Sequence, residues 1–231
     1  MIVERNLIMS LLKLTKDAPV SLEDVKKDAR IASDIAVELL VKLHQEGIIY
    51  LKNDKVEAGS SGRLILASKA VRLGMDVEQA TSFLRWQEFE SIATIALKNN
   101  RYDVIKNLRF KCGGRRWEID VVGCKKPLVI CVDCKHYHHG LSPSAMRKIA
   151  DAQVERTKAL AESMPNINLK VDCAKWDKAK FVPVVLSLLP ASSKFSGTVP
   201  VVPVLQLQDF LCQLPAQVEL LTYFQKDFQH L

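Results

Sequence analysis

The stretch "RRWEIDVVGCKKPLVICVDCK", residues 115–135, contains two strand-like runs joined by a short connector. The first run covers residues 115–122 and the second covers residues 127–135. A connector this short joins antiparallel neighbours, because a parallel pair needs a crossover of a dozen or more residues. A similar run, residues 102–111, precedes the stretch and is separated from it by a Gly-Gly pair. The sequence therefore predicts an antiparallel meander of three strands.

Helical patterns flank this meander on both sides. One helix is expected over residues 77–98 and another over residues 143–164, where Pro143 suits a first helical turn. The two apolar runs that follow indicate strands buried on both faces, and a final helix pair follows them. These later segments are "KFVPVVLSLL", "VPVVPVLQL", "QDFLCQL" and "AQVELLTYFQKDF". The order α, β, β, β, α, β, β, α predicts an α/β domain with a mixed central sheet flanked by helices.

The first 58 residues read as three helices followed by a hairpin. Ser21 and Asp24 have the spacing of a capping box, Gly47 follows a helical pattern as a C-cap, and Asn53-Asp54 forms a hairpin turn. This order resembles a small winged helix-turn-helix domain. We expect such a domain over residues 1–58, a connecting helix over residues 59–76, and the α/β domain over residues 77–231.

Bulk composition is that of a globular protein, with 48% apolar and 26% charged residues in a chain of 231. Glu4 and Arg5 lie within the first ten residues, which is unlike a signal peptide. The longest apolar run, "FVPVVLSLLPA", is too short to span a bilayer and contains Pro183. We therefore expect a cytoplasmic protein with no membrane partner, whose six cysteines are reduced thiols.

The positive charge of the chain is concentrated in one segment. Residues 98–148 hold twelve lysines and arginines and four acids, so their net charge is +8. The whole chain carries +7, which leaves −1 for the rest. A polyanion such as nucleic acid is the natural partner of such a segment. The alternative interpretation is a basic surface that serves solubility alone.

Cys131 and Cys134 form a C-x-x-C pattern, which suggests zinc or redox chemistry. Side chains alternate between the two faces of a strand, so these two cysteines point in opposite directions. A zinc site needs converging ligands, and a thioredoxin-type motif must open a helix. The alternative is small apolar packing, which we favour, although His136, His138 and His139 lie near enough in sequence to supply further ligands.

The same alternation places Asp133 and Lys135 together on one face of the strand. Asp120 lies on the neighbouring strand, and the short turn lets Asp120 and Asp133 face each other. Two close carboxylates repel, and a divalent cation relieves that repulsion. Hard oxygen ligands suit Mg²⁺ or Mn²⁺. A salt bridge between Asp133 and Lys135 is the alternative without a metal.

Asp120 followed by Asp133-x-Lys135, on a meander that comes after a helix, resembles the PD-(D/E)xK nuclease superfamily. The likeness is closest to archaeal Holliday junction resolvases and Mrr-type catalytic domains. It implies a restriction-endonuclease-like αβββαβ core in which Asp120 and Asp133 are catalytic metal ligands and Lys135 is the catalytic lysine. The resemblance also implies a helix glutamate as a further catalytic acid and metal ligand, which "WQEFE" supplies. Glu90 lies on the apolar face of this helix and is the preferred candidate, whereas Glu88 lies away from that face and is expected to be solvated. The backbone carbonyl of Cys134 is an implied further ligand. The proline that usually precedes the first aspartate is Ile119 here.

This resemblance predicts a Mg²⁺- or Mn²⁺-dependent endonuclease that hydrolyses phosphodiester bonds in DNA, with RNA not excluded, and that works as a homodimer. Basic side chains around the turns of the meander are expected to contact the nucleic-acid backbone. Gln153 resembles a glutamine that some branches place near the active site; the alternative is a solvated helix residue. The expected nucleic-acid contacts are Arg109, Lys111, Arg115, Arg116, Lys125, Lys126 and Gln153. The rival functions are a DNA-binding or regulatory protein of the same fold without cleavage, and a zinc or redox protein.

Overall fold

The computed structural model describes residues 2–135, 142–164, 176–188 and 193–228. The chain divides into two compact units, Met1–Phe89 and Glu90–Leu231. The sequence had suggested a boundary near residue 76, so the observed division lies later in the chain. Fully buried Arg63, whose guanidinium binds the carboxylate of Glu88, ties the residues before Glu90 to the first unit.

The first unit is mainly helical, with a small antiparallel sheet in the order β1-β3-β2. Ser21 accepts a hydrogen bond from the backbone N–H of Asp24 at 3.0 Å, which confirms the predicted N-cap. Gly47, with φ of 71°, ends a helix as expected, and Asn53 and Asp54 both have positive φ in the hairpin. The elements are α1 (Ile2–Leu14), β1 (Val20–Ser21), α2 (Leu22–Ala29), α3 (Ser33–Gln45), β2 (Tyr50–Lys52), β3 (Lys55–Glu57), α4 (Ser60–Arg72) and α5 (Val77–Ser82).

The single helix predicted over residues 77–98 is wrong, because the structure has α5 and then α6 (Trp86–Asn99). The Phe83 carbonyl accepts a hydrogen bond from Nη2 of Arg63. The backbone N–H of Arg85 donates to the Glu88 carboxylate at 2.8 Å, which is a helix-capping interaction. These side-chain bonds replace the backbone bonds that would have continued one helix through residues 83–85.

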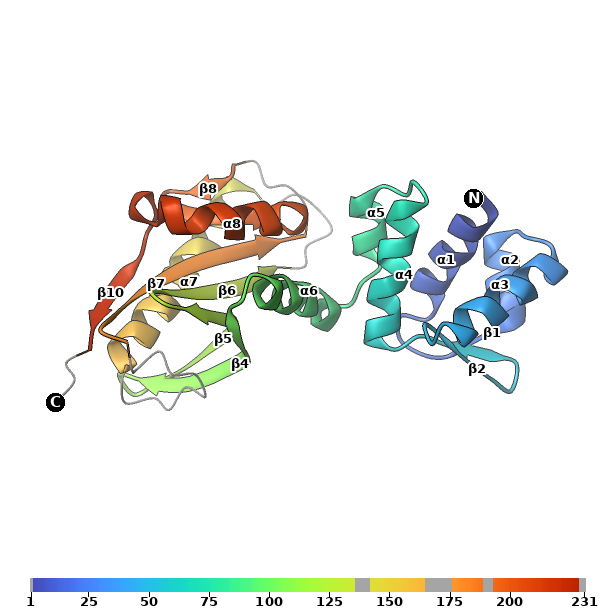
Figure 1. The fold of residues 1–231 in the computed structure, drawn as a ribbon, viewed down its shortest axis with the longest axis horizontal. Coiled ribbons are helices and arrows are strands. Elements are labelled where there is room, and N and C mark those ends of the chain that lie inside the picture. The colour runs from blue at the N-terminus through green and yellow to red at the C-terminus, as the bar shows by residue number, and fades with distance from the viewer. Residues whose placement is uncertain (1, 136–141, 165–175, 189–192, 229–231) are drawn as a thin grey trace. The chain divides into compact units, whose positions relative to one another are not determined.

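The second unit is a mixed α/β fold whose central sheet has the strand order β4-β5-β6-β7-β9-β8 (Figure 1). The predicted antiparallel meander is confirmed, and β7 runs parallel to both β6 and β9. Every residue from Phe181 to Ser187 is buried, as the apolar run predicted. The elements are β4 (Asp103–Cys112), β5 (Arg115–Lys125), β6 (Leu128–Lys135), α7 (Pro143–Ser163), β7 (Lys178–Ser187), β8 (Phe195–Ser196), β9 (Val199–Pro203), η2 (Val204–Gln206), α8 (Leu207–Gln217), η3 (Val218–Leu220) and β10 (Phe224–Asp227).

Helices cover both faces of this sheet, with α7 on one face and α6 and α8 on the other (Figure 1). Asn100, just after α6, donates from its amide to Gln208 at the start of α8 over 2.9 Å. A side chain at position 123 would collide with Leu97, so Gly123 lets α6 pack closely on β5. On the opposite face Leu160 of α7 packs in a core cluster with Val129 and Cys131.

The predicted C-terminal helix over residues 216–228 is wrong in its second half. The chain leaves α8 at Gln217, passes through η3, and forms β10, which pairs antiparallel with β7. Phe224 lies opposite Phe181 in this ladder. Residues 224–227 have helical apolar spacing, but they pair with residues 178–181 of β7 and therefore form a strand. Tertiary pairing often outweighs the local preference of a short segment in this way. Across the parts of the chain that the structure describes, no helix has the length and apolar character needed to cross a membrane.

Candidate functional site

Asp133 and Lys135 lie at the C-terminal end of β6, where the predicted alternation holds. Asp133 is 4% exposed, and Nζ of Lys135 lies 3.0 Å from its Oδ1 and 2.9 Å from its Oδ2. Cys131 belongs to the same face of the strand and packs in the core cluster beneath α7. The side chains of Asp133 and Lys135 therefore meet as an ion pair on the α7 side of the sheet.

Asp120 lies on β5 next to Asp133, as expected. The β5–β6 ladder ends at the pair Val121–Val132, so Asp120 and Asp133 are the residues just beyond its last pair. The Asp120 carboxylate accepts a hydrogen bond from the backbone N–H of Cys134 at 2.7 Å. Burial and the negative charge of Asp133 raise the pKa of Asp120, against the lowering effect of that hydrogen bond.

The sheet is distorted around Asp120. Ile119 and Val122 both pack in the core cluster on the α7 face, although regular alternation would put them on opposite faces. The β4–β5 ladder skips Asn107 and Asp120, between the pairs Lys106–Val121 and Leu108–Ile119. Asn107 has a positive φ of 50°, a conformation that asparagine tolerates better than most residues. The strand thus changes face at the position of the carboxylate, which frees its side chain to reach β6.

Glu90 is the acid that α6 contributes. Its side chain is only 2% exposed, and its Oε1 is buried without a hydrogen-bond partner. Burial, together with the negative charge of Asp120, raises the pKa of Glu90 to about 7. A buried carboxylate oxygen without a partner is costly and requires an explanation such as a missing ion or a catalytic role.

Glu88 differs from the expectation of a solvated helix residue. It is fully buried, and its carboxylate lies 3.0 Å from Nε of Arg63 and 2.7 Å from Nη2 of Arg85. These contacts all lie within the first unit. Glu88 therefore has a structural ion-pair role, which leaves Glu90 as the acid beside Asp120.

The charge on Glu90 yields a testable pH dependence. Its pKa in the folded chain exceeds the usual 4.5, so the native state binds the proton more tightly than the unfolded state does. The stability cost of ionising Glu90 therefore grows as the pH rises from about 4.5 to about 7 and is complete above that. We expect Glu90→Gln to raise the melting temperature relative to wild type more at pH 8 than at pH 5.

Thermal melts of both proteins across this pH range check the prediction. Glu155→Gln is the matched control, because Glu155 is on the same unit but its side chain is 66% exposed. The control should change the melting temperature little at either pH. A difference between Glu90→Gln and wild type that stays constant with pH would contradict a raised Glu90 pKa.

Helix α7 contributes Gln153, which the resemblance places near the active site, and Arg156, which it does not. Nη1 of Arg156 lies 2.9 Å from Oδ1 of Asp133. Gln153 is fully buried and donates from Nε2 to the carbonyl oxygen of Cys131 at 2.8 Å. A fully buried side chain cannot contact DNA, so the predicted nucleic-acid contact of Gln153 is replaced by a role in seating α7 on β6. The Gln153-x-x-Arg156 spacing, one helical turn, is the sequence pattern that could have linked them.

The two cysteines of the C-x-x-C point away from each other, as alternation predicted. Cys131 is in the α7-side core, and burial and the nearby carboxylates raise the pKa of Cys134 well above its usual value. Metal binding and redox reactivity both require the thiolate. This environment therefore disfavours a zinc or redox role for Cys134. His136, His138 and His139 lie outside the described residues.

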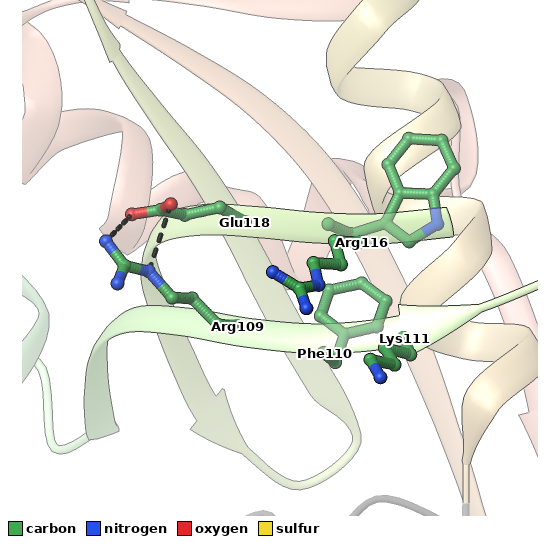
Figure 2. Close-up of a pocket in the computed structure, with 6 residues that line it drawn as sticks. Arg109, Phe110, Lys111, Arg116 and Glu118 are labelled. Atoms are coloured by element: carbon green, nitrogen blue, oxygen red, sulfur yellow. Dashed lines mark hydrogen bonds and ion pairs between the residues drawn. The ribbon is translucent and has the colours of Figure 1, made fainter. Parts of the chain in front are cut away.

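Most of the predicted basic contacts lie on the β4–β5 hairpin, which extends past the end of the β5–β6 ladder. Arg109, Lys111, Arg116 and Glu118 share one face of this hairpin and line a surface pocket together with Phe110 and Trp117 (Figure 2). Arg109 forms two hydrogen bonds to Glu118, at 3.1 and 3.3 Å. Lys111 and Arg116 are directly opposite each other, and like charges in this position destabilise a hairpin unless an anion joins them.

The other basic residues predicted to contact nucleic acid each have a contact within the protein. The Arg115 guanidinium lies 4.1 Å from the centre of the Trp117 ring. Lys126 pairs with Asp177 at 2.9 Å. Lys125 donates to the backbone carbonyl of Asn100 at 3.1 Å. Within the described residues, Lys111 and Arg116 are therefore the two predicted basic contacts whose charged groups have no ion pair, hydrogen bond or ring contact.

The carboxylates of Asp120 on β5, Asp133 at the C-terminal end of β6 and Glu90 on α6 offer hard oxygen donors, which are the ligands that Mg²⁺ prefers. Among the described residues, no three His, Cys, Asp or Glu side chains form a ready-made metal site. Mg²⁺ commonly uses only one or two carboxylates, with water and substrate phosphate completing its shell. Asp120, together with the unpartnered oxygen of Glu90 or with Asp133, fits that requirement by donor chemistry.

Comparisons with known proteins are sparse. No family model matches the chain, and no curated protein matches it. Among solved structures, protein VC1899 from Vibrio cholerae is similar, with a TM-score of 0.40 and 14% sequence identity. The match covers 95% of this chain and 53% of that one, so the chain spans about half the length of VC1899.

Proposed function

We propose that the chain is a metal-dependent nuclease that hydrolyses phosphodiester bonds in DNA, with a restriction-endonuclease-like core in its second unit. The observation that carries this proposal is the gathering of three carboxylates and a lysine at one edge of the sheet. Asp120 accepts a hydrogen bond from the backbone N–H of Cys134, the residue after Asp133, and the charge of Asp133 raises the pKa of Asp120. Lys135 pairs with Asp133, and the charge of Asp120 adds to burial in raising the pKa of Glu90. Such mutual repulsion is what a bound Mg²⁺ or Mn²⁺ relieves.

The residues of the chain have separate roles in this mechanism. Asp120 and Asp133 would hold the cation with Glu90 or the Cys134 carbonyl, and the cation would supply Lewis-acid polarisation of the phosphate. Lys135 is 24% exposed and carries three N–H donors, so it can orient the attacking water or stabilise negative charge on the phosphate. Asp133 fixes the direction of the Lys135 ammonium through their ion pair.

The nucleic acid would lie along the β4–β5 hairpin. Lys111 and Arg116 would bind backbone phosphates, which do not carry sequence information. The three helices and hairpin of the first unit have the order of a winged helix-turn-helix domain, which would add a second contact with DNA or with a partner protein. Two copies of the chain would pair as a homodimer to cut both strands of a duplex.

The test is incubation of the purified chain with supercoiled, linear, branched and single-stranded DNA, and with RNA, in Mg²⁺, Mn²⁺ or EDTA. We expect cleavage of at least one DNA substrate that EDTA abolishes and that Asp133→Asn removes. Cleavage that is independent of metal or of Asp133 would contradict the proposed site. Stoichiometric zinc in the purified chain would support the zinc alternative.

A second candidate is a DNA-binding protein of the same fold that does not cleave. The observation in its favour is that Asp133 is already neutralised by two cations, Lys135 and Arg156, without a metal. Binding of DNA in both Mg²⁺ and EDTA, without cleavage of any substrate, would support this candidate.

The hairpin surface gives a quantitative prediction for either function. Replacing Lys111 and Arg116 together by alanine should weaken DNA binding by about tenfold or more at low salt and reduce the slope of log affinity against log salt by about two. Arg109→Ala should have a smaller effect, because Glu118 already compensates its charge. Fluorescence anisotropy with a labelled duplex at several salt concentrations measures both quantities. Equal effects of the double variant and of Arg109→Ala on DNA affinity would show that Lys111 and Arg116 do not bind the phosphates.

A further inference from the structure

Arg156 of α7 contacts Asp133 at the C-terminal end of β6, and the proposed mechanism gives it no role. Its Nη1 lies 2.9 Å from Oδ1 of Asp133, and its side chain is 30% exposed. Nζ of Lys135 lies 3.0 Å from the same Oδ1. One nearly buried carboxylate therefore holds two cations, and this group of three side chains carries a net charge of +1.

A divalent cation on Asp133 would add two further positive charges beside Lys135 and Arg156. Repulsion between charges a few ångströms apart is large in a partly buried site, so one of the two side chains must leave. Lys135 contacts both oxygens of Asp133 and lies two residues away on the same strand. Arg156 contacts one oxygen, belongs to another element, and has a second contact, to Oε1 of Gln153, of only 3.5 Å. Arg156 is therefore the more easily displaced.

We propose that Arg156 is a positioning residue that occupies Asp133 in the metal-free chain, yields Asp133 to the divalent cation, and then binds a phosphate of the nucleic acid. A guanidinium suits this exchange, because its planar donors fit carboxylate and phosphate equally well. Gln153, held by the carbonyl of Cys131, keeps this turn of α7 against β6 while the Arg156 side chain moves. The inference rests on the proposed function and assigns Arg156 to its substrate.

The test measures metal binding and DNA binding separately from cleavage. Calorimetric titration of Mn²⁺ into the full chain without DNA should give an affinity for Arg156→Gln that is about threefold tighter than for wild type, because a competing cation is gone. In Ca²⁺, which also takes oxygen ligands, the same variant should bind a labelled duplex about threefold more weakly, because Arg156 has then left Asp133 and can bind phosphate. In EDTA, where Arg156 stays on Asp133, the variant and wild type should bind the duplex equally. Arg156→Lys should restore both values toward wild type, since it keeps the charge. A merely structural defect would weaken both kinds of binding.

The matched control is Arg147→Gln, which removes the same charge from an exposed position on α7. It should leave the affinity for Mn²⁺ unchanged. The inference is overturned if Arg156→Gln leaves the affinity unchanged or weaker, or if Arg147→Gln tightens it equally. It is also overturned if neither wild type nor Arg156→Gln binds Mn²⁺ in a way that Asp133→Asn removes. The chain could bind Mn²⁺ as expected and yet cleave neither DNA nor RNA. That result would contradict the proposed nuclease function but not the exchange of Arg156 for a metal ion on Asp133.

Discussion

Replacing Lys135 by methionine should reduce metal-dependent DNA cleavage by about a thousandfold while leaving the fold intact. Methionine keeps most of the apolar stem of lysine and removes the ammonium that Asp133 orients at 2.9–3.0 Å. Groups that transfer protons or stabilise developing charge on a phosphate typically contribute about 10²–10⁴-fold to a rate. The measurement is the initial rate of nicking of supercoiled DNA in Mg²⁺, with circular dichroism to verify folding.

Lys178→Met is the control for this substitution. Lys178 is exposed at the start of β7, which runs parallel to β6, so it lies at the opposite end of the sheet from Lys135, and its removal should change the cleavage rate less than about threefold. Equal rates for Lys135→Met and wild type would exclude Lys135 from the chemistry. Loss of cleavage in Lys135→Met with unchanged affinity for DNA would assign Lys135 to the reaction step.

The placement of Asp120, Asp133 and Lys135 on neighbouring strands was predictable, because it depends only on connector length and on alternation along a strand. Short connectors dictate an antiparallel meander, and alternation along a strand then puts Asp133 and Lys135 on one face. The register that brings Asp120 close to Asp133, one residue beyond the last pair Val121–Val132, follows from the length of the turn between β5 and β6. None of these steps required knowledge of how distant parts of the chain pack.

Arg156 and Gln153 could not be placed in this way. Which side of α7 faces β6 depends on how the helix packs over the sheet, and α7 is separated from β6 by residues that give no pattern. A polar residue on a long helix is solvated by default, so the buried bond from Gln153 to the Cys131 carbonyl and the pairing of Arg156 with Asp133 appear only in the fold.

The two errors of secondary structure share that cause. Residues 224–227 have helical apolar spacing, but the open edge of β7 pairs with them as a strand. Residues 83–85 continue a helical pattern, but hydrogen bonds from Arg63 and to Glu88 interrupt it. In both places a contact with a distant part of the chain outweighs a local preference that is worth only fractions of a kcal/mol per residue.

Replacing Glu88 by glutamine should destabilise the first unit by about 3–5 kcal/mol, the usual cost of breaking a buried ion pair from one side. Arg63 and Glu88 both have fully buried side chains. Arg63 also donates to the Leu12 carbonyl at 2.8 Å and to Thr15 Oγ1 at 3.0 Å, so its guanidinium cannot move into water without breaking these bonds. Glu88→Gln keeps the volume but leaves the positive charge of Arg63 without its counter-charge.

Urea unfolding followed by far-ultraviolet circular dichroism measures this loss. Glu46→Gln is the matched control, because Glu46 pairs with Lys69 of the same helix α4 at 2.7 Å but at the surface, where a pair contributes under about 1 kcal/mol. Combining Arg63→Met with Glu88→Leu should recover part of the loss, since no unpaired charge is then buried. A change of under about 1 kcal/mol for Glu88→Gln would mean that Arg63 finds solvent or another partner, and that the pair does not tie the start of α6 to α4.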